Sequence, residues 1–316
     1  MPTHTKTALI LGANGSFGSH AVEAFANAGW NILAQTRTGK NLHANLAKLP
    51  NVTHTPINIE DDTLMAATAK QANVIVNALN PPYKAWAEQV PRITTAVLKA
   101  VKASTTTLIL PGNVYNYGAN MPPHLTADTP HCPTTNLGNI RETLEQAYRA
   151  ANVNGVKIII FRMGDFLMAE KGGNWFDSQM TGALPKGKFT YPGERTTPHA
   201  WAYLPDAART LVQLAEISDE LPQFSDIPFA GTTFTGNQMA TEIGNALGHK
   251  IKTGGVPWPL LKIMALFSGD LKGVMEMRYL WNTPHALDGG ELTRLLPNYQ
   301  ATPTAEVIKA CVARYN

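Results

Sequence analysis

The chain has 316 residues and a formal net charge of +3, with 44% hydrophobic and 16% charged residues. This balance excludes an intrinsically disordered protein, and the absence of any run of Lys or Arg argues against a nucleic-acid partner. The two cysteines, Cys132 and Cys311, lack metal-ligand spacing. We therefore expect no disulfide framework, no metal site and a cytoplasmic location.

No membrane partner is expected. The amino terminus leads directly into a strand-like run and leaves no room for a signal peptide. The most apolar later stretch, residues 256–269, is too short to span a bilayer and is interrupted by Lys262. Residues 259–267 are open to three interpretations, as core, as the lining of a hydrophobic pocket or as a dimer face, and core packing is favoured.

Short apolar runs alternate with helical patterns through the first half of the chain. Strands are predicted at residues 7–11, 31–35, 52–58, 73–79, 106–110 and 156–162, and helices at 16–29, 61–72, 86–103 and 137–152. Continuously apolar strands separated by helices indicate a parallel sheet covered on both faces. The predicted fold class is therefore α/β, with a doubly wound parallel sheet of the Rossmann type.

The alternation weakens after Arg162. Residues 172–201 are rich in Gly and Pro and predict loops with short strands. A strand at 227–231 and helices at 205–216, 236–248 and 304–315 follow, the second helix opened by Thr235 and closed by Gly248. We interpret these segments as a smaller carboxy-terminal lobe. The dinucleotide-binding domain is assigned to residues 1–165, completed by about 201–231, and the substrate-covering lobe to 166–200 and 232–316.

Three glycines stand between the first strand and the first helix, at Gly12, Gly15 and Gly18. In a strand–turn–helix context this spacing predicts a pyrophosphate site. Gly12 would permit the tight turn, Gly15 the close approach of the ligand, and Gly18 the close packing of the helix. The alternative is a structural turn that binds nothing. The cofactor-binding residues predicted in this turn are Gly12, Asn14, Gly15, Ser16, Phe17 and Gly18.

The end of the second strand indicates which cofactor binds. The sequence there contains Thr36, Arg37, Thr38 and Lys40 and no carboxylate for the ribose hydroxyls of NAD. The guanidinium of Arg37 suits the 2′-phosphate of NADP, so NADP is favoured over NAD, with a solvated basic turn as the alternative. Further cofactor contacts are predicted beyond the third and fourth strands, at Asn58, Ala78, Leu79 and Asn80.

The glycine spacing, Arg37 and the Gly-Asn-Val-Tyr turn at residues 112–115 resemble the short-chain dehydrogenase/reductase superfamily. More narrowly, the chain is similar over nearly its whole length to the extended or atypical branch, which contains NAD(P)-dependent epimerases, dehydratases and NmrA-like proteins. This resemblance implies a Tyr-x-x-x-Lys pair for proton transfer. Here Leu137 and Arg141 stand in those two positions, and Leu137 cannot exchange a proton.

The usual Ser or Thr is replaced too, since Asn113 follows Pro111 and Gly112 after the fifth strand. The substitute catalytic residues are predicted among the loops at the cofactor end of the sheet: Tyr83, Asn113, Tyr115 and Arg141. For Arg141 the alternative is an exposed helix arginine paired with Glu145, and for the tyrosines it is structural packing. Weaker candidates lie further along the chain: Asp165, His199, Trp201 and Tyr203.

Two functions are consistent with these residues. The first is an NADP-dependent oxidoreductase or epimerase/dehydratase-like enzyme that acts on a small molecule and uses an unusual acid or base. The alternative is a non-catalytic NADP(H)-binding redox sensor of the NmrA-like type. The size of the later lobe favours the enzyme. A small-molecule partner is expected in the first case, and the sequence leaves a homodimer open.

Overall fold

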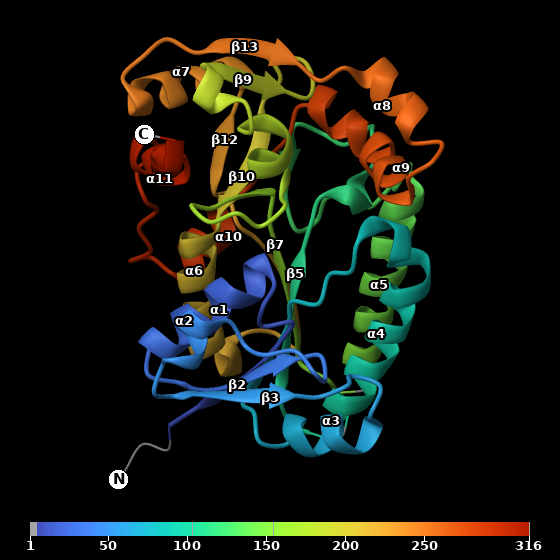
Figure 1. The fold of residues 1–316 in the computed structure, drawn as a ribbon. Coiled ribbons are helices and arrows are strands. Elements are labelled where there is room, and N and C mark those ends of the chain that lie inside the picture. The colour runs from blue at the N-terminus through green and yellow to red at the C-terminus, as the bar shows by residue number, and fades with distance from the viewer. Residues whose placement is uncertain (1–4, 103, 154, 316) are drawn as a thin grey trace. The chain divides into compact units, whose positions relative to one another are not determined.

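The computed structural model describes residues 5–102, 104–153 and 155–315 (Figure 1). The chain forms two compact units. Unit 1 comprises Met1–Gly112, Ile140–Phe161 and Ala208–Ile227. Unit 2 comprises Asn113–Asn139, Arg162–Ala207 and Pro228–Asn316.

Unit 1 is built on a seven-stranded sheet with the order β11-β7-β5-β4-β1-β2-β3. Neighbouring strands run parallel in the pairs β1–β2, β1–β4, β2–β3 and β4–β5. This arrangement confirms the predicted doubly wound sheet. The strands are β1 (Thr7–Leu11), β2 (Asn31–Thr36), β3 (Val52–Pro56), β4 (Val74–Asn77), β5 (Thr107–Gly112), β7 (Ile158–Arg162) and β11 (Phe224–Pro228).

Burial along the strands follows their place in the sheet. Every residue of β4 and β7 is buried, as expected for central strands covered on both faces. In β3, at the edge, Thr53, His54 and Pro56 are exposed. The polar composition of β3 therefore reflects its edge position, while the aliphatic runs of the central strands form the core of unit 1.

Six helices accompany the sheet strands along the chain, and two of them begin in unit 2 and continue into unit 1. They are α1 (Ser16–Asn27), α2 (Ala44–Ala47), α3 (Asp62–Ala69), α4 (Trp86–Lys102), α5 (Asn136–Val153) and α6 (Leu204–Glu216), with 3₁₀ turns at Tyr83–Ala85 and Ser218–Glu220. Helix α3 begins where Asp61 accepts a hydrogen bond from the Leu64 amide at 3.0 Å. The sequence predicted α1, α3, α4, α5 and α6 but not the single turn of α2.

Unit 2 combines three small sheets with five helices. Its strands are β8 (Asp165–Leu167), β10 (His199–Tyr203) and β12 (Thr232–Phe234) in one sheet, β9 (Lys188–Tyr191) with β13 (Lys252–Gly255), and β6 (His124–Leu125) with β14 (Ala286–Leu287). Its helices are α7 (Gly236–Leu247), α8 (Trp258–Met264), α9 (Gly269–Glu276), α10 (Gly290–Leu295) and α11 (Thr304–Val312). Short 3₁₀ segments occupy Tyr115–Tyr117, Leu184–Lys186, Met277–Asn282 and Ala313–Tyr315, and a π-helical turn occupies Phe176–Met180.

An apolar core joins these elements, with Phe176, Trp201, Ile243, Trp281 and Ile308 among its buried residues. Helix α7 packs on α11 within it. The boundaries of α7 confirm the sequence prediction. Thr235 and Gln238 form a reciprocal capping box at its start, and Gly248 closes it in the left-handed conformation.

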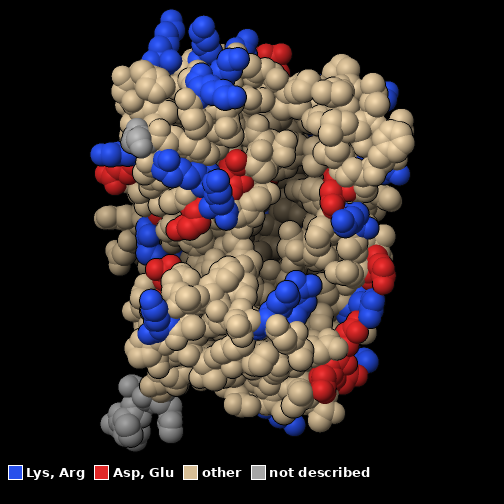
Figure 2. Space-filling model, in the orientation of Figure 1, with Lys and Arg blue, Asp and Glu red and all other residues tan. Residues whose placement is uncertain are grey.

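The interpretation of residues 259–267 as core was wrong. Leu260, Ile263, Met264, Leu266 and Phe267 are exposed, and Phe267 retains 87% of its accessible surface. Among the described residues, no helix is long and apolar enough to cross a membrane. On the face shown in Figure 2, basic and acidic side chains are interspersed over much of the surface.

Candidate functional site: a glycine turn and a buried histidine cluster

In the glycine turn at the end of β1, Gly12 and Gly18 each have a steric reason to be glycine. Gly12 has φ +75°, a conformation that favours glycine, and a Cβ there would lie 3.1 Å from the carbonyl oxygen of Ala78. A Cβ on Gly18 would lie only 2.2 Å from the carbonyl oxygen of Gly12. Gly15 sits between them and donates its amide to Gly12 at 2.9 Å. The turn is therefore closed by backbone contacts that exclude side chains.

Helix α1 begins directly from this turn. Its N-cap, Gly15, supplies no side-chain acceptor, and its first turn contains no acidic residue. The positive end of the helix dipole is therefore not offset by a carboxylate of its own first turn. Such a helix start fits the pyrophosphate of a dinucleotide, because amide groups and dipole both favour a negatively charged ligand.

Gln35 anchors the turn, a role that the sequence analysis missed. Its side chain is 1% exposed, and its Oε1 accepts a hydrogen bond from the Gly12 amide at 2.9 Å. Its Nε2 donates to the carbonyls of Thr36 and Ile57 at 3.0 and 2.7 Å. One buried amide thus connects β1, β2 and the end of β3. A polar residue inside an apolar strand was the available signal.

The predicted cofactor residues of the turn differ in their contacts. Asn14 donates to the carbonyl of Asn41 at 2.8 Å and accepts from the amide of His43 at 3.0 Å, so it holds the loop that follows β2. Ser16 accepts at its carbonyl from the Nδ1 of His20, at 2.8 Å. Phe17 is buried in α1. Asn14 therefore has a structural task that the sequence did not indicate.

Beyond β2 the chain turns at Gly39, and Arg37 is exposed there. The hydroxyl of Thr36 contacts the Lys40 carbonyl at 2.9 Å and the Nε2 of His54 at 2.8 Å, which fixes this turn next to β3. A guanidinium on an exposed, anchored turn suits a phosphate ligand. Asn58 is exposed beyond β3, and its Oδ1 accepts from the Glu60 amide at 3.2 Å.

The loop after β4 lies against the glycine turn. The Ala78 amide donates to the Leu11 carbonyl at 3.1 Å, beside Gly12, and the Leu79 amide contacts Oδ1 of Asn77 at 3.3 Å. Asn80 is exposed. The structure thus brings two segments that the sequence predicted for cofactor binding together, at the carboxyl ends of the neighbouring strands β1 and β4.

Tyr83 and Arg141 converge on one aromatic ring of unit 1. Tyr83 is half-buried and meets Trp86 edge-on at 5.3 Å between ring centroids. The guanidinium of Arg141 lies 6.0 Å from the centre of the Trp86 ring and donates to the Pro111 carbonyl at 2.8 Å. Arg141 is 7% exposed, so the alternative of an exposed helix arginine was wrong.

Asn113 and Tyr115 belong to unit 2, where they form a turn over a buried arginine. Oδ1 of Asn113 accepts from the Tyr115 amide at 3.1 Å, and its carbonyl accepts from Arg162 at 2.6 Å. Tyr115 is 8% exposed. Leu137, which the resemblance predicts in place of the family's tyrosine, is also buried, and its amide donates to Glu276 at 2.6 Å.

Unit 2 also contains a buried histidine cluster. The Nε2 of His199 on β10 donates to Oδ2 of Asp165 on β8 at 2.8 Å, and His199 is 1% exposed. The ring of Trp281 stacks on the imidazole of His199, with 4.2 Å between the ring centroids. The imidazole of His285 meets that of His199 edge-on, at 4.4 Å. The ring of Trp201 also contacts His199, with 5.1 Å between the ring centroids. The sequence named His199, Asp165 and Trp201 only as weaker candidates, and the fold brings these three together.

The cluster holds several polar atoms without partners. His199 Nδ1, His285 Nε2, the indole nitrogens of Trp201 and Trp281 and the Tyr191 hydroxyl are buried, with no hydrogen-bond partner among the described residues. Burial, followed by the neighbouring His199, lowers the pKa of His285 to about 3 and keeps it neutral. Burial is the main cause that raises the pKa of Tyr191 above its usual value. Buried polar atoms of this kind call for a ligand or water partner.

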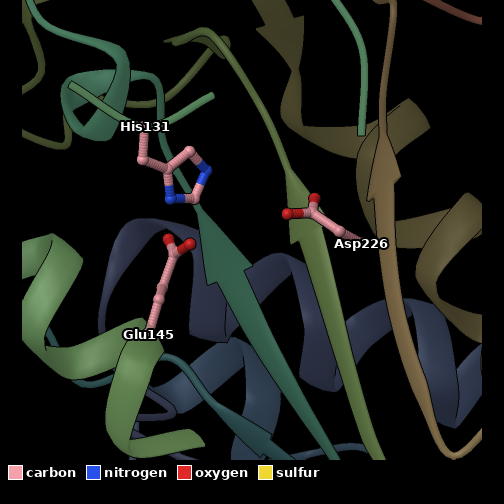
Figure 3. A group of neighbouring side chains, drawn as sticks. All are labelled: His131, Glu145 and Asp226. Atoms are coloured by element: carbon pink, nitrogen blue, oxygen red, sulfur yellow. The ribbon is translucent and has the colours of Figure 1, made fainter. Parts of the chain in front are cut away.

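Two buried carboxylates of unit 1, Glu145 on α5 and Asp226 on β11, lie within 4.8 Å of one another (Figure 3). Nη2 of Arg149 lies 3.8 Å from Oδ2 of Asp226 and supplies a positive charge beside the pair. We assign no metal to them. Figure 3 also draws His131, which belongs to unit 2.

The NmrA-like family model matches residues 4–290. No curated protein sequence matches the chain. Among solved structures, the UDP-glucuronic acid 4-epimerase of Bacillus cereus, in complex with UDP-glucuronic acid and NAD, aligns with a TM-score of 0.78 at 14% identity over 98% of both chains. The UDP-glucose 4-epimerase of Bifidobacterium longum, with NAD⁺ and UDP, gives 0.74 at 16% identity over 98% of both chains.

The Bordetella bronchiseptica enzyme WbmH, in complex with NAD⁺, also gives a TM-score of 0.74 at 16% identity, over 99% of this chain and 98% of its own. At these identities the likeness shows the fold. The Rossmann architecture of the sheet is thereby confirmed by comparison as well as by strand order.

Proposed function

Because the chain belongs to the NmrA-like family of the short-chain dehydrogenase/reductase superfamily, we propose that it binds NADP in unit 1. The family match confirms the resemblance inferred from the glycine spacing and the Gly-Asn-Val-Tyr turn. The observation that carries the proposal is the glycine turn, where Gly12 and Gly18 leave no room for a Cβ and α1 begins without a carboxylate. These residues fit a dinucleotide pyrophosphate.

The preference for NADP rests on the turn after β2. Arg37 is exposed there, and no carboxylate stands among residues 36–40 to bind a 2′-hydroxyl. The similar solved structures contain NAD. The 2′-phosphate of NADP and the guanidinium of Arg37 are complementary, whereas the adenosine ribose of NAD lacks that phosphate.

The proposed activity is that of an oxidoreductase or epimerase/dehydratase-like enzyme on a small molecule. NADP would supply reversible hydride transfer at its nicotinamide. Unit 1 would hold the cofactor through the glycine turn, Arg37 and the residues 78–80. Sugar nucleotides are the first substrate class to test, because similar structures bind UDP-sugars.

The proton carrier must differ from the family's tyrosine, because Leu137 is buried and has no ionisable group. Tyr83, Asn113, Tyr115 and Arg141 remain our proposed substitutes. The His199–Asp165 pair is a further one, because a histidine held by a carboxylate is suited to accept or deliver a proton. Hydrogen bonding to Asp165 directs the Nδ1 of His199 away from that carboxylate.

A second function has one observation in its favour. The buried Leu137 removes the usual proton transfer and suits a redox sensor whose signal is occupancy by NADP or NADPH. A sensor must bind the two forms with different affinities, because only differential affinity shifts its state. An oxidoreductase must instead consume cofactor when given its substrate, whereas an epimerase or dehydratase returns the hydride and must convert the substrate with no net change in cofactor.

The first experiment is a calorimetric titration with NADP, NADPH, NAD and NADH. We expect the phosphorylated forms to bind. Arg37→Asp should weaken their affinity by tenfold or more, which is roughly the contribution of one charge-assisted hydrogen bond. Lys102→Asp, an exposed charge on α4, is the matched control. Failure of all four nucleotides to bind contradicts the proposal.

Turnover is tested next, by following both cofactor absorbance and conversion of the substrate, with sugar nucleotides and then with wider metabolite mixtures. Variants Tyr83→Phe, Tyr115→Phe, Arg141→Lys and His199→Gln identify the proton carrier by loss of turnover with retained cofactor binding. Unchanged cofactor and unchanged substrate in every mixture, together with unequal affinity for NADP and NADPH, decide for the sensor.

A further inference from the structure

Five large apolar side chains of unit 2 are exposed within eight positions of the chain. We call this group the α8 patch: Leu260, Ile263, Met264, Leu266 and Phe267, with exposed fractions of 54%, 60%, 47%, 70% and 87%. Most exposed apolar residues of a protein are scattered singly and need no explanation, whereas a contiguous group indicates an interaction site. Figure 2 shows largely uncharged surface where α8 and α9 lie, at upper right.

The α8 patch is carried by an anchored segment. Trp258 is buried at the start of α8, and its Nε1 donates to the Pro192 carbonyl at 2.7 Å. Arg278 lies over the same ring at 4.9 Å. Leu261 packs against the core of unit 2, and Ala265 is buried. The helix therefore has one face fixed to the unit, while the apolar residues of the patch point away from it.

The backbone at the tip of the segment is hydrogen-bonded within itself. The amides of Ala265, Leu266 and Phe267 donate to the carbonyls of Leu261, Ile263 and Met264 at 2.8, 3.1 and 3.1 Å. Such a tip can move from water into an apolar layer while these amides keep their hydrogen bonds. That is a requirement for any segment that enters the apolar part of a lipid interface.

Basic residues outnumber acidic ones in the segment of the chain that carries the α8 patch. Residues 249–278 include five Lys or Arg and two Asp or Glu, and one of the acids, Glu276, accepts the Leu137 amide. Lys262 lies within the patch, and Lys272 follows it on α9. On the other side Lys252 of β13 pairs in register with Lys188 of β9, and Figure 2 shows basic side chains gathered over these strands.

We propose that the α8 patch docks unit 2 onto an anionic lipid surface, with Leu266 and Phe267 entering the headgroup region and the lysines contacting lipid phosphates. An apolar tip and neighbouring lysines are the two features that attract a peripheral protein to such a surface. The expectation of no membrane partner rested on the length needed for a span, and a segment lying in the interface needs no such length.

The test is sedimentation of the full chain with vesicles of phosphatidylcholine alone or with 30% phosphatidylglycerol, roughly the anionic content of a charged leaflet. We expect binding to the anionic vesicles that weakens as salt is raised. Leu266→Ser combined with Phe267→Ser is expected to reduce binding by about tenfold or more. Lys262→Glu should reduce it by about fivefold or more.

The matched controls lie in unit 1, where Leu64 on α3 is 51% exposed and Lys70 is exposed. Leu64→Ser and Lys70→Glu should bind vesicles like the parent protein, and circular dichroism should show the same melting temperature for all variants. Absence of binding to anionic vesicles, or equal binding by the double serine variant, overturns the proposal. A concentration-dependent dimer that the double variant abolishes, without vesicle binding, assigns the patch to a second copy instead.

Discussion

The imidazole of His199 and the carboxylate of Asp165 form a hydrogen bond of 2.8 Å inside unit 2, across the parallel strands β10 and β8. Asp165 lies opposite Trp201, two residues beyond His199. The bond holds one nitrogen of the imidazole and leaves Nδ1 buried without a partner among the described residues. An oriented, buried imidazole of this kind is costly for the fold unless it binds something.

Asp165→Leu is expected to destabilise the protein by about 1–3 kcal/mol, because the N–H of His199 loses its acceptor inside the core. Urea unfolding followed by circular dichroism measures the loss. The conservative Asp165→Asn should cost less, since an amide oxygen still accepts. The exposed Asp219→Asn serves as control. Equal stability of Asp165→Leu and the parent protein would mean that His199 finds another acceptor.

His285 should make the protein sensitive to acid. Its pKa is lowered from 6.5 to about 3, by burial first and by His199 second. The unfolded chain therefore binds this proton more readily, and the stabilisation is present above pH 6.5 and is lost as the pH falls from 6.5 toward 3. The slope is at most about 1.4 kcal/mol per pH unit.

His285→Asn tests this dependence, because an amide nitrogen can still donate to the Thr283 carbonyl as the Nδ1 of His285 does at 2.9 Å. The midpoint of acid unfolding should move to lower pH in the variant, while His249→Asn, on an exposed residue, should leave it unchanged. Coincident acid transitions for parent and variant would exclude His285 as the sensitive group.

Gly18→Ala and Gly15→Ala should have different consequences. A Cβ on Gly18 meets the Gly12 carbonyl oxygen at 2.2 Å, so the substitution should cost about 1–3 kcal/mol and also weaken NADP binding. A Cβ on Gly15 lies 3.2 Å from the same oxygen, a much smaller conflict. Gly15→Ala should therefore keep its melting temperature and lose cofactor affinity.

Differential scanning fluorimetry with and without NADP separates the two effects. Gly254→Ala is the control, because nothing lies within 4 Å of a Cβ there. If Gly15→Ala binds NADP as tightly as the parent protein, the pyrophosphate does not approach this glycine.

Tyr148→Phe should destabilise unit 1. The Tyr148 hydroxyl accepts a hydrogen bond from Nδ2 of Asn77 at 2.9 Å, and both residues are buried. Removing the hydroxyl leaves that amide without its acceptor, at a cost of about 1–3 kcal/mol. Burial is also the first cause that raises the pKa of Tyr148 from 10 to about 12.

The folded state therefore keeps the phenolic proton more firmly than the unfolded chain, so this stabilisation is present below pH 10 and is lost between pH 10 and about 12. Thermal melting across this range should show a steeper alkaline decline for the parent protein than for Tyr148→Phe. Parallel declines would show that Tyr148 does not control alkaline stability.

The two thiols should differ in reactivity. Cys132 is exposed, whereas Cys311 is buried in α11 and burial is the first cause that raises its pKa to about 12. Since the thiolate is the reactive form, a disulfide reagent should label one thiol in the native protein and the second only after unfolding. Cys132→Ser should abolish the native reaction. Two rapid equivalents in the native protein would show that α11 opens readily.

Local pattern predicted much of the fold. Strands β1 and β2 lie within one residue of the expected ranges, and α7 has the capping residues foreseen at Thr235 and Gly248. These features are encoded within a few neighbouring residues. Asp206 shows the limit of such encoding. It lies in the first turn of α6, and its carboxylate accepts hydrogen bonds from the amide and hydroxyl of Thr302, a residue far along the chain, at 2.7 and 2.6 Å.

By itself the sequence determined the alternation of strands and helices and the glycine turn, because each depends on residue type and short spacing. Tertiary structure alone decided that His199 meets Asp165, that Arg141 is buried, and that the apolar face of α8 is left exposed. Periodicity shows that a helix has an apolar face. It does not show what covers that face, since this depends on residues distant along the chain.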